Sequence, residues 1–126
     1  MEIFGNKYHK IIHGDAMDAL TSEVKDSSVD LIFIDPPYNI GKNFNGHKDK
    51  WENDSDYLEW SYTWLQFCIK KLKPTGSLYV MTSTQFMPYF DIFLRDKLHI
   101  LSRIVWYYDS SGVQAKNYYG SLYEPI

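Results

Sequence analysis

The sequence predicts an α/β protein in which helices cover a doubly wound, mostly parallel sheet. Short apolar segments alternate with longer amphipathic ones along the 126 residues, which is the layout of that fold class. The centre of one segment, Leu31-Ile32-Phe33-Ile34, is continuously apolar, as in a parallel strand covered on both faces. Such sheets bind ligands beyond the carboxyl ends of their strands, where Asp15, Asp35 and Thr82 are expected.

The first half of the chain begins with a strand, a helix and a second strand. Asp15 precedes the helical pattern and is a residue type that caps helices. Pro36-Pro37 must end the second strand, because neither proline can donate a hydrogen bond to a neighbouring strand. The predicted strands are residues 10–13 and 29–35, the helix is 16–24, and a polar loop covers about 39–53.

The second half continues the alternation of helices and strands. A long apolar pattern at three- and four-residue spacing predicts an amphipathic helix that begins at Asp54 or Ser55. Pro74-Thr75-Gly76 follows it as a stop signal. The predicted helices are residues 54–72 and 86–94, the strands are 77–81 and 100–107, and the loops include 109–113 and 118–120.

Composition narrows the function classes. The net charge of −3 argues against a self-sufficient DNA-binding module, although a catalytic domain can carry this charge. The single cysteine, Cys68, excludes an internal disulfide, and the four histidines show no ligand spacing, so no metal is expected. The first residues do not resemble a leader, and no apolar run reaches membrane-spanning length. We therefore expect a cytoplasmic protein that does not engage a membrane.

The tetrapeptide Asp35-Pro36-Pro37-Tyr38 contains the groups needed to methylate an exocyclic amine. The lone pair of such an amine is delocalised into the ring, and acceptors placed against its N–H groups can free it. The Asp35 carboxylate can accept one hydrogen bond and the Pro36 carbonyl the other. The two prolines fix the backbone and aim that carbonyl. Tyr38 can offer a face on which a flipped base stacks.

The tetrapeptide matches the catalytic motif of the DNA amino-methyltransferases, and the sequence resembles that family from about Tyr8 onward. Its Asp form is typical of adenine-N6 enzymes, whereas cytosine-N4 enzymes more often carry Ser there. Three further segments of this chain are similar to segments of that family: Ile12-His13-Gly14-Asp15-Ala16, Leu72-Lys73-Pro74-Thr75-Gly76-Ser77-Leu78-Tyr79-Val80 and Ile104-Val105-Trp106-Tyr107-Tyr108.

The resemblance implies a Rossmann-like, S-adenosylmethionine-dependent methyltransferase fold. It implies double-stranded DNA with a flipped adenine as substrate and S-adenosylmethionine as methyl donor. The implied catalytic residues are Asp35, Pro36, Pro37 and Tyr38. The implied cofactor-binding residues are Asp15, Ala16, Asp35 and Pro36, and the implied substrate-binding residues are Tyr38 and Asn39.

The sequence lacks the glycine-rich Phe-x-Gly-x-Gly segment that comes late in this family, and most of the target-recognition region. We therefore expect residues 1–126 to be the N-terminal catalytic portion of an incomplete doubly wound domain. The strand 29–35 would then have an exposed apolar edge, a template for pairing with another chain. This predicts self-association, or pairing with a missing C-terminal half, and no activity for the chain alone.

Other interpretations remain open. The enzyme could instead act on cytosine N4, an RNA base or a protein glutamine, or the chain could be a non-catalytic remnant or a split subunit that needs a partner. Asp15 could serve only as a helix cap. The lysines of the 39–53 loop are expected on a solvated surface. Ser110, Ser111 and Gly112 lie in a loop that could reach substrate.

Overall fold

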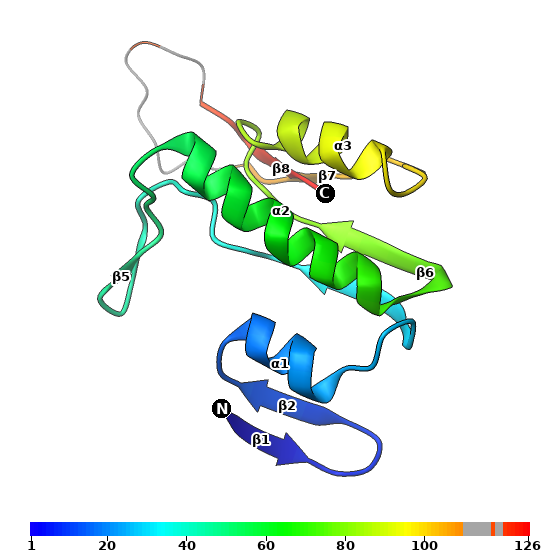
Figure 1. The fold of residues 1–126 in the computed structure, drawn as a ribbon. Helices are drawn as coiled ribbons and strands as arrows, with labels where there is room; N and C mark the ends of the chain where they lie inside the picture. Colours follow the sequence, from blue (N-terminus) through cyan, green and yellow to red (C-terminus); the bar gives the residue numbers. More distant parts are fainter. Residues whose placement is uncertain (110–116, 118–119) are drawn as a thin grey trace. The chain divides into compact units, whose positions relative to one another are not determined.

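The computed structural model describes residues 1–109, 117 and 120–126, so the loop positions Ser110, Ser111 and Gly112 lie outside the described residues. Helices and strands are interspersed along the chain (Figure 1). They are β1 (Glu2–Gly5), β2 (Lys10–His13), α1 (Ala16–Glu23), β3 (Val29–Ile34), β4 (Asn43–Phe44), β5 (His47–Lys48), α2 (Asp54–Lys71), β6 (Leu72–Val80), α3 (Met87–Arg95), β7 (Val105–Tyr107) and β8 (Tyr123–Pro125).

The chain divides into two compact units. The first comprises Met1–Ile32 and Thr63–Leu78, and the second comprises Phe33–Tyr62 and Tyr79–Ile126. Because the described residues form both helices and strands, the predicted α/β class is confirmed. The described strands form four two-stranded sheets, β1–β2, β3–β6, β4–β5 and β7–β8, so the single doubly wound sheet remains a prediction.

The first unit opens with an antiparallel hairpin of β1 and β2 in which Glu2 lies opposite His13. Strand β1 was not predicted. Helix α1 follows, and Asp15 is its N-cap as predicted, because its side chain accepts hydrogen bonds from the backbone N–H groups of Met17 at 2.8 Å and Asp18 at 3.2 Å. The cap satisfies two of the amides that the first turn of a helix leaves without an internal partner.

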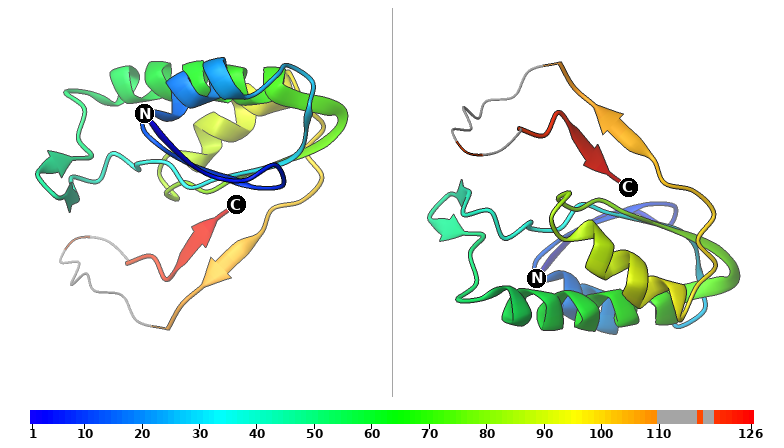
Figure 2. Two further views of the ribbon diagram at one scale, coloured as in Figure 1. Left: turned by 90° about the horizontal axis from the view of Figure 1, so that it is seen from below. Right: turned by 90° about the horizontal axis from the view of Figure 1, so that it is seen from above.

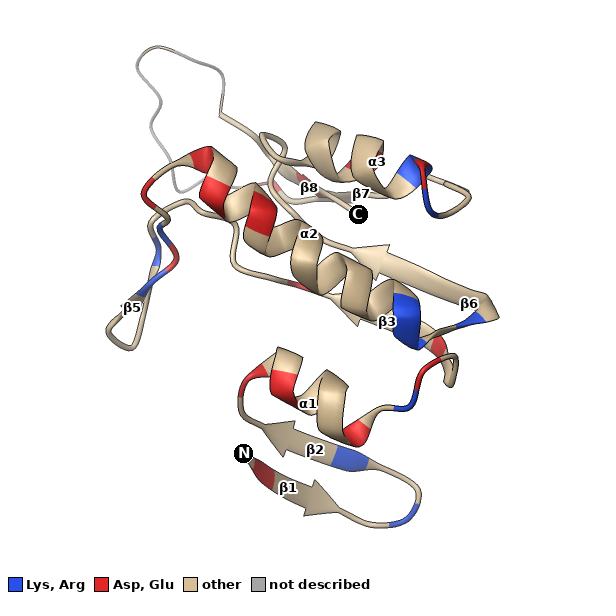
Figure 3. Cartoon of the chain, in the orientation of Figure 1, with Lys and Arg blue, Asp and Glu red and all other residues tan. Residues whose placement is uncertain are grey.

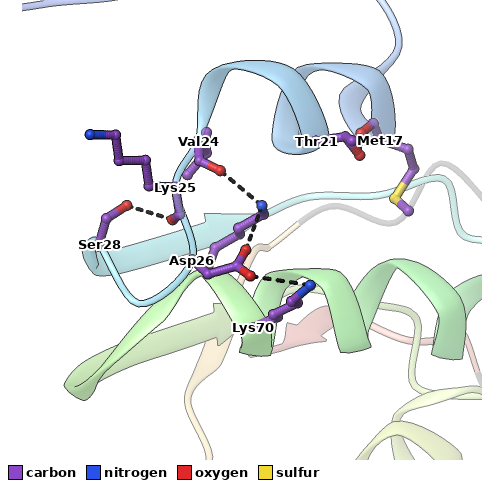
Figure 4. A network of polar contacts seen from close by, with 8 residues as sticks. Met17, Thr21, Val24, Lys25, Asp26, Ser28 and Lys70 are labelled. Atoms are coloured by element: carbon purple, nitrogen blue, oxygen red, sulfur yellow. Dashed lines mark hydrogen bonds and ion pairs between the residues drawn. The ribbon is translucent and has the colours of Figure 1, made fainter.

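The end of α2 is fastened to the turn between α1 and β3. Lys71 is buried, and its Nζ donates to the Val24 carbonyl and to Asp26, both at 2.8 Å. Lys70 also pairs with Asp26, at 3.1 Å (Figure 4). Hydrogen bonds from both lysines hold the pKa of Asp26 below its usual range. Two backbone bonds, from Ser27 to Lys70 and from Ser28 to Lys71, complete this junction.

Strands β3 and β6 pair, and in the described part of the chain β3 has no second strand beside it. Leu31 and Phe33 are 58% and 55% exposed, whereas Ile32 and Ile34 are half-buried. The prediction that both faces of this strand are covered is therefore wrong for this chain. The alternating burial is that of a strand with one open face.

The second unit has an aromatic core. Tyr57 and Phe90 are fully buried and Phe86 nearly so. The Tyr57 ring lies 4.6 Å from that of Phe86 and 4.9 Å from that of Trp51, measured between centroids. The rings of Trp51, Trp60, Tyr57 and the two phenylalanines therefore act mainly in packing.

Two strands close to the chain end complete the second unit. Strands β7 and β8 run antiparallel, with Trp106 opposite Glu124, and lie side by side in both views of Figure 2. Beyond this pair, the Thr82 amide donates to the Pro125 carbonyl at 3.4 Å. The predicted strand over 100–107 is shorter than expected, because only Val105–Tyr107 meets a partner strand.

The long helix α2 matches its prediction closely. It carries Asp54 and Asp56 in its first turn and Lys70 and Lys71 in its last, the distribution that complements the helix dipole (Figure 3). It ends at Lys71, one residue earlier than predicted, and β6 begins directly and passes through Pro74. Cys68 on this helix is buried, and burial raises the pKa of its thiol to about 11. No helix in the described part of the chain is long and apolar enough to cross a membrane.

Replacing Lys71 with Met should lower the free energy of unfolding by about 1–3 kcal/mol, because the Val24 carbonyl loses its donor. Urea denaturation followed by circular dichroism measures this change. Lys70→Met is the matched control: its side chain is 67% exposed, so a loss below about 0.5 kcal/mol is expected. Equal effects of the two substitutions would contradict a structural role for the buried lysine.

Candidate active site at the Asp-Pro-Pro-Tyr turn

The tetrapeptide begins where β3 ends, as predicted. The Ile34 carbonyl accepts a hydrogen bond from the Met81 amide at 2.8 Å, the final contact between β3 and the segment that follows β6. Asp35 comes next and its side chain is exposed to solvent. The turn therefore presents a carboxylate directly beyond the carboxyl end of a paired strand.

The double proline is attached to the aromatic core by a side chain from α2. The Tyr57 hydroxyl donates to the Pro37 carbonyl at 2.8 Å. Burial raises the pKa of Tyr57, so the hydroxyl keeps its proton and its role as donor. The Pro37 carbonyl is thus occupied, while the neighbouring Pro36 carbonyl is the one predicted to accept a hydrogen bond from the amine.

Tyr38 is held at both its backbone and its side chain. Its amide donates to Asp49 Oδ2 at 3.2 Å, and its hydroxyl donates to Asp35 Oδ1 at 2.6 Å. A second carboxylate, Glu124 Oε2, lies 3.3 Å from the same hydroxyl. Burial raises the pKa of Tyr38 far above its usual range, and both carboxylates raise it further. The side chain thus acts as a neutral donor between two anions.

Asn39 shapes the loop that follows. Its backbone has a φ of +57°, a left-handed conformation that asparagine tolerates better than most residues. The residue is 6% exposed; its Oδ1 accepts from the Trp51 amide at 3.0 Å and its Nδ2 donates to Asp54 Oδ1 at 3.3 Å. Both polar ends are therefore engaged in closing the loop onto the start of α2. Its predicted contact with substrate remains a prediction.

Asp49 supports the same loop from its far end. It is 6% exposed; its carbonyl accepts from the Gly41 amide at 3.1 Å, and its amide donates to the Lys42 carbonyl at 3.0 Å. Between these contacts, β4 and β5 form a short hairpin that the sequence did not predict. The predicted polar loop is therefore a structured segment with a closed base.

The structure brings Asp35, Pro37, Tyr38 and Asn39 together in the second unit. Asp15 and Ala16 belong to the first unit, where Asp15 is exposed and caps α1, so their cofactor role remains a prediction.

Sequence reasoning missed three residues: Tyr57, Asp49 and Glu124. Tyr57 falls within the predicted helix 54–72, whose apolar pattern indicated no role for it at the motif. The two acids gave no local signal that could have found them.

The two carboxylates at the Tyr38 hydroxyl suit the binding of a group that carries N–H donors or a positive charge. Asp35 is exposed and can accept hydrogen bonds from outside the chain, while Glu124 adds a second negative charge beside it. Comparison with known proteins agrees with this chemistry: the sequence profile described as DNA methylase, for N6 and N4 methyltransferases, matches residues 29–126. The chain belongs to the DNA methylase family.

Individual relatives support the family assignment. The chain is 53% identical over 98% of its length to the DNA adenine methyltransferase YhdJ of Escherichia coli K12, and covers 41% of that protein. It is 35% identical over 86% of its length to the type II methyltransferase M.HpaI of Haemophilus parainfluenzae, covering 35% of it. For M.BamHI of Bacillus amyloliquefaciens the identity is 40%, over 71% of this chain and 21% of the relative. The chain thus spans less than half the length of these family members.

Two substitutions of Asn39 separate its backbone and side-chain contributions to the stability of this loop. Asn39→Gly should cost about 1–3 kcal/mol in unfolding free energy through the lost side-chain hydrogen bonds. Asn39→Ala should cost about 1 kcal/mol more, because alanine disfavours the left-handed backbone. Thermal or urea unfolding measures both.

Asn45 is the control for that pair, since it has a φ of +50° and an exposed side chain. Asn45→Gly should change stability by less than about 0.5 kcal/mol. If Asn39→Gly were equally harmless, the loop would not depend on the amide contacts.

Proposed function

We propose that residues 1–126 are the N-terminal catalytic portion of an S-adenosylmethionine-dependent DNA methyltransferase that acts on adenine N6. The proposal includes an incomplete, Rossmann-like doubly wound fold. One observation carries it: in a chain of the DNA methylase family, Asp35 projects into solvent at the end of β3 with Tyr38 hydrogen-bonded to it.

Asp35 is proposed as the acceptor for the target amine. A carboxylate that accepts one N–H draws the nitrogen toward tetrahedral geometry and makes its lone pair available for attack. The Pro36 carbonyl is proposed as the second acceptor. Since the prolines fix the backbone and Tyr57 anchors the Pro37 carbonyl, the Pro36 carbonyl needs little reorganisation to bind the amine.

Tyr38 is proposed to face the flipped base, and the buried Asn39 is proposed to contribute to substrate binding indirectly. The Tyr38 ring is half-buried and can offer one face for stacking while its hydroxyl stays bound to a carboxylate. Asn39 acts on this surface through the loop that it closes. The net charge of −3 gives this chain no bulk attraction for phosphates, so we propose that the main contacts to double-stranded DNA come from the additional length that its relatives possess.

S-Adenosylmethionine supplies a methyl group activated by a positively charged sulfonium. The acidic pair Asp35 and Glu124 fits a cation of this kind, because Asp35 is exposed and both carboxylates lie at one hydroxyl. Asp15, Ala16, Asp35 and Pro36 are the residues proposed to hold the donor.

Adenine is preferred over the alternatives because the 53% identical relative is named a DNA adenine methyltransferase. Cytosine N4 is the second candidate target, since the family profile is named for both N6 and N4 methyltransferases. RNA and protein glutamine remain further alternatives within the same chemistry. A non-catalytic remnant would show no transfer even when joined to a C-terminal region, whereas a split subunit would show transfer only together with its partner chain.

The activity test uses this chain joined to the C-terminal region of the E. coli relative. We expect transfer from labelled S-adenosylmethionine to unmethylated plasmid DNA, with N6-methyladenine as the product in nucleoside mass spectrometry. Asp35→Asn should reduce the rate about 100-fold or more, because the acceptor loses its charge, while DNA binding is largely retained. The chain by itself should show no transfer.

Asp18→Asn is the matched control, because Asp18 is an exposed carboxylate on α1. N4-methylcytosine as the product would overturn the adenine assignment. Loss of DNA binding together with activity in Asp35→Asn would instead assign Asp35 a structural role. Transfer by the chain alone that requires Asp35 would contradict its proposed dependence on a C-terminal half.

The isolated chain is also proposed to self-associate through β3. The strand has an open edge among the described residues, and Leu31 and Phe33 expose apolar surface beside it. Light scattering coupled to size-exclusion chromatography should show dimers or larger species, and Leu31→Lys with Phe33→Lys should reduce them. Ile92→Lys on α3 is the control, since Ile92 is equally apolar and 69% exposed. A monodisperse wild-type monomer would refute this proposal.

A further inference from the structure

The hydroxyl of Tyr38 has two acceptors and a single proton. It lies 2.6 Å from Asp35 Oδ1 and 3.3 Å from Glu124 Oε2. A phenolic hydroxyl donates one hydrogen bond, so the short contact is the occupied one and the long contact is a second position for the same proton. The hydroxyl can change acceptors through a small rotation, without a backbone movement.

Glu124 is held at this hydroxyl by backbone pairing. It lies in β8 opposite Trp106 of β7, and the next residue, Pro125, is buried and accepts from the amide of Thr82, which is fully buried. Tyr38 is fixed independently through its amide bond to Asp49. Two segments separated by 86 positions in sequence therefore meet at one oxygen atom with both backbones restrained.

The short bond to Asp35 conflicts with the proposed role of that carboxylate. A charge-assisted hydrogen bond draws electron density from its acceptor, which weakens Asp35 as an acceptor for an amine. If the hydroxyl simply released Asp35, a half-buried donor would lose its partner, which is unfavourable. A second carboxylate within reach removes that penalty.

We propose that Glu124 is a positioning residue that receives the Tyr38 hydrogen bond when Asp35 binds the target amine. This role rests on the proposed function, and it acts through Tyr38 without contact between Glu124 and the reacting atoms. Asp35 then enters the reaction with its acceptor oxygen free. The Tyr38 ring stays in place, because its hydroxyl only exchanges one carboxylate for another.

Such an exchange requires Tyr38 to remain protonated. Its pKa is raised chiefly by burial, and then by the hydrogen bond to Asp35 and the charge of Glu124. The charged groups that face Tyr38 in the described structure are Asp35, Glu124 and Asp49, all of them acids. The raised pKa keeps the hydroxyl protonated, and so a donor, at neutral pH.

The first test observes the hydroxyl directly in the chain as it stands. Tyrosine labelled with ¹³C at Cζ gives one signal for each tyrosine, and Tyr38→Phe identifies the signal of Tyr38. Donation to a carboxylate displaces this signal from those of exposed tyrosines. The signal is measured in the wild type, in Asp35→Asn, in Glu124→Gln and in the double variant.

If the Tyr38 hydroxyl can exchange Asp35 for Glu124, the losses of signal displacement in the variants should not be additive. Asp35→Asn should keep most of the displacement, because the hydroxyl moves to Glu124, and Glu124→Gln should keep most of it through Asp35. The double variant should lose more than the two single losses together, because both carboxylates are then replaced by amide oxygens, which are weaker acceptors. If Asp35→Asn alone loses as much as the double variant, Glu124 does not receive the bond and the proposal is wrong. Both substitutions preserve side-chain size, and unchanged signals of the other tyrosines verify folding.

The second test measures catalysis in the completed enzyme. Glu124→Ala should lower kcat about ten- to a hundredfold with little change in KM for DNA, because the Tyr38 hydroxyl then has no second acceptor and stays bound to Asp35. Glu124→Gln should restore most of kcat, since its amide oxygen still accepts. Glu52→Ala, at an exposed glutamate, is the control. A rise in KM alone, or no rescue by Gln, would overturn the proposal.

The two tests keep this inference separate from the proposed function. If the completed enzyme transfers no methyl group, the proposed function fails, whereas the spectra still decide whether the hydroxyl passes to Glu124.

Discussion

The geometry of the site depends on the hydrogen bond from Tyr57 to the Pro37 carbonyl. Tyr57 is fully buried at the centre of the aromatic cluster, and its hydroxyl reaches the turn that follows β3. A turn of two prolines has a fixed backbone conformation, but this alone does not set its orientation relative to the core. The contact with α2 sets the orientation of the turn, since a helix packed on aromatic rings cannot shift without disturbing the core. The position of the Asp35 carboxylate therefore depends on apolar packing that is remote in sequence.

The loop after the motif supplies the second restraint. Asn39 and Asp49 are buried polar residues: Asn39 bonds Trp51 and Asp54 across the loop, and Asp49 accepts from the Tyr38 amide. The tetrapeptide is thus fixed by a paired strand on one side and by a closed loop on the other. Such support from both directions is the usual requirement for a site that must present acceptors to a ligand without reorganisation.

Local signals in the sequence were sufficient for some elements and insufficient for others. The Asp15 cap, the end of β3 at the prolines and the extent of α2 each follow from a few adjacent residues, and the structure agrees with them. Strand β1 and the position of Glu124 arise only from pairing with distant partners, which no local pattern encodes. Asn39 was recognised as a candidate, but its buried amide contacts depend on Trp51 and Asp54 across the loop. The Asp-Pro-Pro-Tyr motif could be recognised from the sequence because its four residues are contiguous.

The burial of Cys68 gives the chain a built-in reporter. Its thiol is shielded by neighbouring side chains and is held in the protonated form at neutral pH, because its pKa is near 11. Thiolate is the reactive species in alkylation, so the native state is protected twice, by access and by protonation. As this is the only cysteine in the chain, the rate at which an alkylating reagent modifies the protein measures how often the C-terminal half of α2 opens to solvent.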